Sequence, residues 1–322
     1  MNTEKRIGLI KRNTAEIISE EELRQLLAKK KKPVVYCGYE PSGPVHLGHF
    51  VTITKLIDFA NAGFKVKVLL ADIHALLNRK GEGEKIREDV ENWKRTIKAI
   101  GLDAEIVLGS DFQFSKDYTT DVMKMSQETT INRGLRSMQE VARDIENATV
   151  SQLWYPLMQI EDIKALGCDV AYGGLEQRKI HMLALELADT IGHKPIIVHT
   201  PLITSLKGPG QKMSKSVPGS FVSVTDSDED IKKTISSAYC PEKSAENNPI
   251  LQIARLIVFP RIKSLDITRQ EKFGGNISFK VYEDLERVYT AGKLHPMDLK
   301  AAIAGELIKI IRPVREQFAK NK

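Results

Sequence analysis

Short apolar runs alternate with longer segments of helical character between residues 34 and 199, and this alternation constrains the fold more than any other feature of the chain. The runs are rich in β-branched residues and lie at residues 34–39, 66–71, 104–108, 170–172 and 195–199. Strands this apolar are buried on both faces, and strands that alternate with helices form parallel sheets covered by helices. The pattern therefore predicts an α/β fold built on a doubly wound parallel sheet.

The segments between these runs predict the helices, at residues 46–60, 85–100, 118–148, 151–166 and 176–190. The segment at 118–148 is longer than the others, so we expect a helical insertion between the two halves of the sheet, at about 113–150. A further helix is expected at 20–32, where the lysines at 29–32 would form a cationic last turn. An RNA-binding patch is the alternative interpretation of those lysines.

The chain changes character beyond residue 199. A loop rich in Gly, Pro, Lys and Ser occupies residues 204–220, and an acidic turn from Asp226 to Asp230 follows it. Carboxylates are favoured beside the unpaired N–H groups that begin a helix, so this turn predicts a helix N-terminus. We therefore expect an α/β domain over residues 1–203, a loop and linker over 204–226, and a smaller α-helical domain over 227–322.

Composition narrows the possible partners and compartments. The chain of 322 residues is 42% hydrophobic and carries a formal charge of +6, which favours anionic partners such as nucleotides or RNA. Its cysteines, Cys37, Cys168 and Cys240, lie too far apart for a Cys-x-x-Cys metal or redox motif. No apolar run is long enough for a signal peptide or a membrane helix. We expect a cytoplasmic protein that does not associate with membranes.

A turn rich in Gly and Pro joins the first run to a helix start that carries His46 and His49. Residues three apart share one helix face, so both imidazoles can reach one ligand at the positive end of the helix dipole. Gly48 would let a flat base approach the backbone closely, and Gly38 is a second glycine expected at this site. The arrangement suits ATP, although such a histidine pair can also be a helix cap and a surface residue.

A second motif, Lys212-Met213-Ser214-Lys215-Ser216, lies in the loop rich in Gly, Pro, Lys and Ser. Lysines in such a loop can close over a polyphosphate and stabilise the charge that develops on a leaving pyrophosphate. Taken alone, a loop of this composition is most often solvated. Because the two motifs occur in this order at opposite ends of the doubly wound pattern, we expect them to form one ATP site.

Both motifs resemble the signatures of a known enzyme family. His46-Leu47-Gly48-His49 resembles the HIGH signature, and Lys212 to Ser216 matches the KMSKS signature, of class I aminoacyl-tRNA synthetases. The resemblance implies a Rossmann-like catalytic domain in which His46, His49, Lys212 and Lys215 are catalytic and Met213 also contacts ATP. It implies that Mg²⁺ accompanies the nucleotide, with no metal bound tightly by the protein itself.

A polar stripe marks the helix expected at 151–166. Tyr155, Gln159 and Asp162 recur at helical spacing on a segment that is otherwise largely apolar. Buried polar groups need partners, so the stripe either lines a cavity or faces water. The spacing leaves both alternatives open.

The segment from Tyr155 to Asp162 resembles the substrate helix of archaeal and eukaryotic-type tyrosyl-tRNA synthetases, and the similarity extends over nearly the whole chain. It implies that Tyr36 and Asp162 hold the phenol of L-tyrosine, and that Tyr155, Gln159 and Gln177 hold its ammonium group. Archaeal members often carry a serine where this chain has Lys215. A tryptophanyl paralogue shares the fold and the signatures, but an acceptor for a phenol favours tyrosine.

The resemblance also implies contacts with tRNA(Tyr). Phe273 would stack on the anticodon guanine and Asp298 would accept from its edge, whereas Arg178 and Arg136 would read the first base pair of the acceptor stem. Ordinary packing is the alternative for Phe273. We expect a homodimer formed through the helical insertion, and activation of tyrosine to tyrosyl-adenylate followed by transfer to the 3′-terminal adenosine of the tRNA. The rival functions are a nucleotidyltransferase without an RNA substrate and a non-catalytic RNA-binding protein.

Overall fold

The computed structural model describes every residue of the chain except 143–144, 211–216, 218 and 320–322. The chain divides into two compact units. The first comprises Met1–Gly43 and Lys55–Pro201, and the second comprises Pro44–Thr54 and Leu202–Lys322. In this division the segment that carries His46 and His49 groups with the C-terminal part of the chain.

The first unit is built on a six-stranded sheet. Its strands are β1 (Glu16–Ile18), β2 (Val34–Tyr39), β3 (Lys65–Leu70), β4 (Glu105–Leu108), β5 (Val170–Gly174) and β6 (Ile196–Thr200). The spatial order is β1-β6-β5-β2-β3-β4, and every neighbouring pair from β6 to β4 is parallel. This is the order of a Rossmann-like sheet, in which the connections reverse direction between the adjacent strands β2 and β5.

One edge of the sheet was not predicted. Strand β1 pairs antiparallel with β6, so that Glu16 lies opposite His199 and Ile18 opposite Ile197. Three residues are too short a segment to show a periodic pattern. The strand therefore follows from pairing with the buried strand β6 rather than from a local preference.

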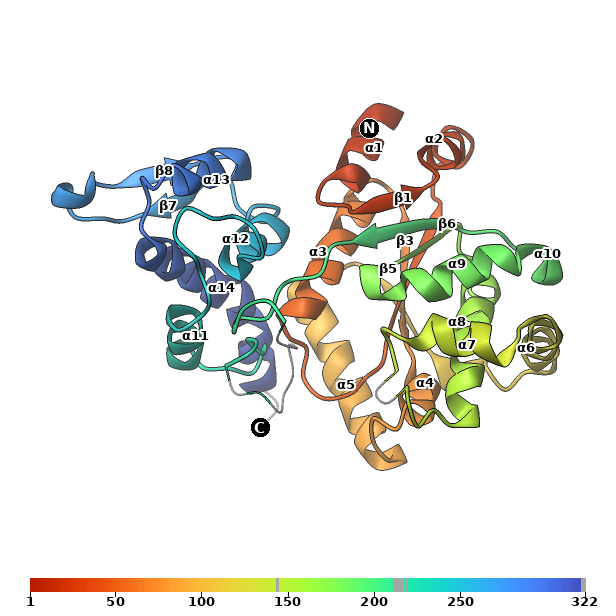
Figure 1. Cartoon of the computed structure of the whole chain (residues 1–322). Coiled ribbons are helices and arrows are strands. Elements are labelled where there is room, and N and C mark those ends of the chain that lie inside the picture. Colours follow the sequence, from red (N-terminus) through yellow and green to blue (C-terminus); the bar gives the residue numbers. More distant parts are fainter. Residues whose placement is uncertain (143–144, 211–216, 218, 320–322) are drawn as a thin grey trace. The chain divides into compact units, whose positions relative to one another are not determined.

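Helices cover both faces of the sheet, as Figure 1 shows with α5 on one side and α8 and α9 on the other. The doubly wound fold is thus confirmed. The helices that the first unit contains, wholly or for α3 in part, are α1 (Thr3–Lys11), α2 (Glu20–Lys29), α3 (Leu47–Asn61), α4 (Asp72–Leu77), α5 (Gly83–Ile100), η1 (Gly109–Asp111), α6 (Lys116–Glu128), α7 (Ile131–Met138), α8 (Val150–Ala165), η2 (Leu175–Gln177), α9 (Arg178–Glu186) and α10 (Ala188–Ile191).

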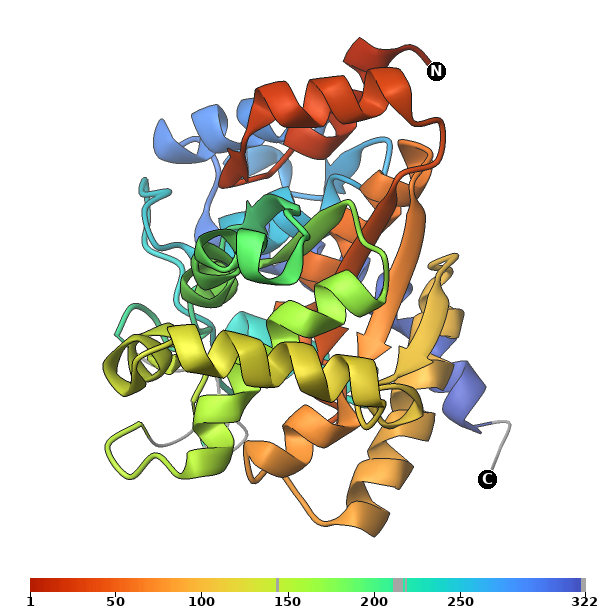
Figure 2. The ribbon, with the colours of Figure 1, turned by 90° about the vertical axis from the view of Figure 1, so that its right-hand side faces the viewer.

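The single long helix expected at 118–148 is wrong. Two shorter helices, α6 and α7, occupy the first part of that stretch, and Figure 2 shows them in yellow in front of the sheet. The break falls at Thr129, whose backbone is extended, and at Thr130, whose side chain accepts from the Arg133 N–H and caps α7. The Thr130 side chain bonds to the backbone at the start of α7, and this bond competes with the continuation of α6.

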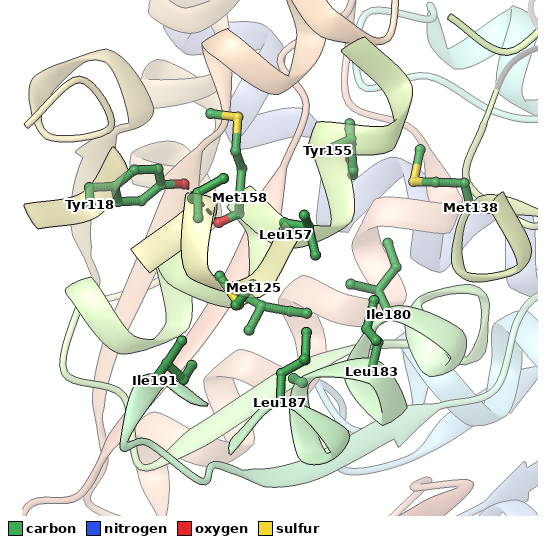
Figure 3. Packing of buried hydrophobic residues seen from close by; sticks show 13 residues of the cluster. Tyr118, Met125, Met138, Tyr155, Leu157, Met158, Ile180, Leu183, Leu187 and Ile191 are labelled. Carbon is green, nitrogen blue, oxygen red and sulfur yellow. Dashed lines mark hydrogen bonds between the residues drawn. The ribbon is translucent and has the colours of Figure 1, made fainter. Parts of the chain in front are cut away.

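A buried cluster joins this insertion to the rest of the first unit. It unites Met125 of α6, Leu157 of α8 and Leu183 of α9 with Met138 and Ile180, as Figure 3 shows. Aliphatic and thioether side chains packed in this way fix the helices in position relative to one another. The packing sets the rotation of α8 and therefore decides which of its side chains face the sheet.

The second unit is mainly helical. Its elements are α11 (Asp228–Ser236), α12 (Pro249–Ile253), the π-helical turn η3 (Ala254–Val258), β7 (Leu265–Ile267), η4 (Glu271–Phe273), β8 (Ile277–Phe279), α13 (Tyr282–Thr290) and α14 (Pro296–Ala319). The acidic turn begins α11, where the Ser227 side chain accepts from the Asp230 N–H. The two-stranded hairpin β7–β8 was not predicted, and Figure 1 shows it beside α13.

Candidate active site

The carboxyl ends of β2 and β5 lie at the point where the sheet reverses its winding, which is where open α/β sheets bind their ligands. Gly38, close to the end of β2, is the one exposed residue within a strand that is otherwise buried or half-buried. A Cβ atom on Gly38 would lie 2.6 Å from the Tyr36 hydroxyl oxygen, so this hydroxyl folds over the Gly38 backbone. A side chain at position 38 would therefore displace the Tyr36 hydroxyl from this position.

Asp162 lies within this part of the first unit and is 0% exposed. Its Oδ1 accepts from Gln113 Nε2 at 2.7 Å and from the Tyr118 hydroxyl at 2.8 Å. Its Oδ2 has no hydrogen-bond partner in the described part of the chain. Burial raises the pKa of Asp162 to about 7, although the bonds from Gln113 and Tyr118 oppose the shift. One oxygen of the carboxyl is thus held in place, and the other can accept from a ligand.

Two further side chains complete the surroundings of this carboxyl. Burial, and next the nearby Asp162 carboxylate, raise the pKa of Tyr36 well above its usual value, so the phenol stays protonated. His74 is 1% exposed, and burial lowers its pKa to about 4, which keeps the imidazole neutral. Its Nε2 lies 3.7 Å from Asp162 Oδ2, too far for a hydrogen bond, and neither atom has another partner among the described residues.

The polar stripe of α8 is buried. Tyr155, Gln159 and Asp162 are 5%, 8% and 0% exposed, so the alternative that the stripe faces water is excluded. The Tyr155 hydroxyl donates to Glu40 Oε1 at 2.6 Å, and Gln159 Nε2 donates to Gln177 Oε1 at 3.0 Å. Gln159 is therefore tied to Gln177.

Two consecutive glycines end β5. A Cβ atom on Gly173 would lie 2.9 Å from Gln177 Cγ, and one on Gly174 would lie 2.2 Å from Glu176 Oε2. A side chain on either glycine would therefore displace the Gln177 or the Glu176 side chain from this position. Burial raises the pKa of Glu176, whose Oε2 has no hydrogen-bond partner in the described structure.

Several residues of this pocket were not found from the sequence: Glu40, His74, Gln113, Tyr118 and Glu176. Glu40 directly follows β2, and His74 and Gln113 closely follow β3 and β4. Polar residues that follow parallel strands converge at one edge of a sheet, so this rule could have identified them. Tyr118 has no such signal, because it reaches Asp162 only through the packing of α6 on α8.

The histidine pair lies in the second unit, at the start of α3. The Gly48 N–H donates to His46 Nδ1 at 3.1 Å, and the His46 N–H donates to His49 Nδ1 at 3.2 Å. The ring centroids lie 3.9 Å apart. Because each Nδ1 accepts, each neutral ring carries its proton on Nε2, which is the nitrogen suited to donate to a phosphate oxygen.

The segment that follows the lysine loop returns to these histidines. The Leu47 N–H donates to the Val222 carbonyl at 3.0 Å, and the Val224 N–H donates to the Val45 carbonyl at 3.0 Å. His46 and Ser223 form a bridge between these two bonds. Lys212, Met213 and Lys215 lie outside the described residues, so their closure over a polyphosphate stays a prediction.

The arginines expected to contact RNA differ in their surroundings. Arg178 begins α9, is exposed and donates from Nε to Glu16 Oε1 at 2.7 Å. Arg136 is exposed on α7. Arg133, also on α7, is held by two bonds to Glu186, at 2.8 and 2.7 Å. Arg143 lies outside the described residues.

Phe273 and Asp298 lie in neighbouring parts of the second unit. The Phe273 ring is 60% exposed at the hairpin tip, with Lys272 Nζ 4.9 Å from its centroid. Arg269 ties this hairpin to the segment before α14, because its Nε donates to Gly275 O and its Nη1 to Lys293 O, both at 2.9 Å. Asp298 lies half-buried in the first turn of α14. The exposure of Phe273 argues against ordinary packing.

The described residues lack two features. They contain no group of three or more His, Cys, Asp or Glu side chains placed to hold a metal ion. Nor does any of the described helices combine the length and the apolar character that crossing a bilayer requires.

Comparisons with known proteins agree with the geometry. The family model of class I tRNA synthetases (W and Y) matches residues 28–312. The tyrosine–tRNA ligase of Methanoculleus marisnigri is 52% identical over 310 residues, which cover 96% of this chain and 97% of that protein. The ligase of Methanopyrus kandleri is 49% identical over 320 residues, or 98% of each chain.

A solved structure shows the same fold. The crystal structure of tyrosyl-tRNA synthetase complexed with L-tyrosine from Archaeoglobus fulgidus matches with a TM-score of 0.95 at 47% identity, and the match covers 98% of this chain and 99% of that one. The Rossmann-like sheet and these full-length similarities lead to one conclusion. The chain belongs to the class I tRNA synthetases of the tryptophan and tyrosine group.

Proposed function

We propose that this protein is a tyrosine–tRNA ligase, which activates L-tyrosine with ATP and transfers it to the 3′-terminal adenosine of tRNA(Tyr). The observation that carries the proposal is the Asp162 carboxyl, buried with one oxygen bonded and the other unpaired. The full-length relatives and the tyrosine complex of the Archaeoglobus fulgidus enzyme support the choice of tyrosine. No feature of the described residues favours tryptophan or a reaction without RNA.

The phenol of the substrate suits the unpaired atoms of the pocket. Its hydroxyl would donate to Asp162 Oδ2 and accept from the Tyr36 hydroxyl. Phenylalanine would leave both side chains buried without that partner, and an unpaired buried polar group opposes binding by about 1 to 3 kcal/mol. Selection would therefore arise from the penalty on the wrong ligand as much as from contacts with the right one.

The ammonium end of the substrate needs acceptors. The amide oxygens of Gln159 and Gln177 and the hydroxyl of Tyr155 supply them, and the Gln159–Gln177 bond holds both amides in a fixed orientation. Glu176 Oε2, the unpaired acceptor at the end of β5, is a further candidate for a substrate donor. Groups that are held before binding lose little side-chain freedom when the substrate arrives.

The residues that we propose to catalyse adenylate formation belong to the second unit. The tyrosine carboxylate attacks the α-phosphorus of ATP in line, and pyrophosphate leaves. His46 and His49 would donate to phosphate oxygens from Nε2, while Lys212 and Lys215 would neutralise the charge on the leaving pyrophosphate. Mg²⁺ would enter with ATP on its phosphate oxygens, as that ion commonly does, and supply charge neutralisation there. Gly38, Gly48 and Met213 would contact the nucleotide.

Transfer follows when a hydroxyl of the terminal ribose attacks the adenylate carbonyl and AMP leaves. No covalent intermediate on the protein is needed, so positioning of the RNA contributes much of the rate. Arg178 and Arg136 would meet the acceptor stem with planar, many-donor side chains. Phe273 would stack on the anticodon guanine, and Asp298 would accept from its edge.

We further propose that two copies of the chain associate through the helical insertion. Exposed apolar side chains gather on or beside α6 and α7, where Phe114, Met123 and Ile131 are 72%, 53% and 68% exposed. Such a group is typical of a protein interface. We place the enzyme in the cytoplasm, where its free cysteines stay reduced.

Exchange of pyrophosphate into ATP, measured in parallel with tyrosine, tryptophan and phenylalanine, tests the activation step. We expect exchange with tyrosine alone, and charging of tRNA(Tyr) transcripts on addition of RNA. Asp162→Asn serves as the control for the pocket, because it keeps the shape and removes the charge. Exchange with tryptophan but not tyrosine would overturn the specificity, and tyrosine exchange without any charging would overturn the role of RNA as substrate.

A further inference from the structure

A line of hydrogen bonds in the first unit involves three side chains that the reaction above does not use. Glu16 Oε1 accepts from Arg178 Nε at 2.7 Å and lies 2.8 Å from His199 Nδ1. His199 Nε2 lies 2.8 Å from His181 Nδ1, and the two rings are stacked with 17° between their planes. The line runs inward from the exposed Arg178 to His181, which is 1% exposed.

The carboxylate sets the direction of every bond along the line. Glu16 can only accept, so His199 carries its proton on Nδ1 and accepts on Nε2 from the His181 Nδ1–H. His181 Nε2 is then an unprotonated acceptor, and it has no hydrogen-bond partner in the described structure. Burial lowers the pKa of both imidazoles, in agreement with this neutral arrangement. Buried acceptors rarely stay unpaired, so the His181 end of the line can still receive one donor.

The inner end lies against the amino-acid pocket. A Cβ atom on Gly173 would lie 3.5 Å from His181 Cε1 and 2.9 Å from Gln177 Cγ, so both side chains pack on the backbone of this glycine. Gln177 is bonded to Gln159 and directly precedes Arg178. The two ends of the line therefore meet the same segment, from Gly173 to Arg178, at the carboxyl end of β5.

At the exposed end of the line, Glu16 orients Arg178 and leaves the two terminal nitrogens of its guanidinium available. Glu16 engages Arg178 through Nε, and no hydrogen bond from either terminal nitrogen of Arg178 is found among the described residues. Glu16 itself is fixed because β1 pairs with β6, which places it opposite His199. A guanidinium held in this way presents its two terminal nitrogens in a defined direction, and such preorganisation favours binding of a phosphate or base edge.

We propose that Glu16, His199 and His181 are positioning residues that orient Arg178 for RNA and tie it to the Gly173–Gln177 wall of the amino-acid pocket. Their loss therefore impairs transfer to RNA more than it impairs adenylate formation. This inference rests on the proposed function, because it assigns a support to one of the predicted RNA contacts.

Glu16→Gln is the informative variant, because it keeps the size of the side chain and removes its charge. We expect kcat/KM for tRNA charging to fall about tenfold, mainly through KM for the RNA, while tyrosine-dependent pyrophosphate exchange stays within about twofold of the parent. The matched control is Glu22→Gln, which removes another carboxylate of an exposed pair, with Lys194 at 2.6 Å, and should leave both rates unchanged. Arg178→Ala completes a double-mutant cycle, and Glu16→Gln should add nothing in that background.

Each outcome separates this inference from the function on which it rests. Equal losses of exchange and charging in Glu16→Gln would indicate a merely structural role, and additive losses in the cycle would show that Glu16 does not act through Arg178. Either result overturns the inference. His199→Gln, which breaks the line while leaving Glu16 in place, should give the same split between exchange and charging. Absence of tyrosine exchange in the parent protein would instead overturn the proposed function.

Discussion

The pocket around Asp162 and the hairpin tip around Phe273 are both assigned to recognition, yet they differ in almost every physical respect. Asp162 is 0% exposed and shares bonds with Gln113 and Tyr118, whereas the Phe273 ring is 60% exposed with Lys272 above it. A buried carboxyl rejects ligands that leave it unpaired, while an exposed ring accepts any flat base. A buried carboxyl can therefore discriminate between ligands by itself, whereas an exposed ring by itself cannot.

Of the variants considered, Asp162→Asn should have the largest effect, which we expect on kcat/KM for tyrosine. Asparagine can still accept from Gln113 and Tyr118 through its oxygen, but it turns an amide donor toward the substrate phenol, whose own proton then has no acceptor. Loss of a bond to a charged group, about 1.5 to 3 kcal/mol, corresponds to a roughly 10- to 150-fold lower kcat/KM for tyrosine. Pyrophosphate exchange at varied tyrosine concentration measures it, and a change below twofold would remove Asp162 from phenol binding.

Phe273→Ala tests the opposite region. Loss of stacking on a base, about 1 to 3 kcal/mol, should raise KM for the tRNA, and the lower half of that range applies because the ring already lies beneath Lys272. We expect an increase of about 5- to 30-fold in charging assays, with pyrophosphate exchange unchanged. Val281→Ala removes another exposed apolar side chain of the same unit, 48% exposed, and should change neither rate. Equal effects of the two variants would deny the ring any specific role.

Tyr118→Phe should give a smaller effect on the pocket side. The Tyr118 hydroxyl lies 2.7 Å from the Met158 carbonyl and 2.8 Å from Asp162 Oδ1, and its ring packs in the cluster of Figure 3. Phenylalanine keeps that packing and removes one donor that orients the carboxyl, a net contribution of about 0.5 to 1.5 kcal/mol. Exchange assays should show a roughly 2- to 12-fold higher KM for tyrosine. An unchanged KM would mean that Gln113 alone orients Asp162.

The sequence was most informative where function and periodicity coincide. The parallel strands and the stripe on α8 could be predicted because burial on both faces and helical spacing leave local patterns. Glu16 on β1 and Tyr118 on α6 could not, because each reaches its partner through tertiary pairing between segments distant in sequence. The hairpin β7–β8 was missed for a different reason, because each of its strands has three residues, too few to show a periodic pattern. Local patterns identify elements, whereas long-range packing decides which polar groups meet.

Helix α8 carries two buried acids, Glu161 and Asp162, and only Asp162 is proposed to bind the substrate. Glu161 therefore shows what burial alone does to an acid on this helix. It neighbours Asp162 in sequence, is 3% exposed and has an Oε2 atom without a hydrogen-bond partner in the described structure. It borders a cavity of about 590 Å³ that Lys124, Lys164 and Asp121 also line. Burial raises the pKa of Glu161 to about 7, as it does for Asp162, but no role in the reaction is assigned to it.

Glu161→Gln should therefore stabilise the protein in a pH-dependent way and leave pyrophosphate exchange unchanged. The folded-state pKa lies above the usual value of 4.5, so between pH 4.5 and 7 the unfolded chain releases a proton that the folded chain retains. Stability contributed by this group falls as pH rises through that window, and the full penalty is present above pH 7. Because Lys164 lies near and offsets part of the penalty, we expect the free energy of unfolding to rise by about 1 to 2 kcal/mol at pH 8 and little at pH 5, seen at pH 8 as a Tm higher by about 2 to 6 °C.

Glu91→Gln, at an exposed position of α5, is the control and should show no such dependence on pH. A Glu161→Gln protein less stable than the parent at pH 8 would mean that its carboxylate is paired in solution, and the two acids of α8 would then differ in electrostatics as well as in use.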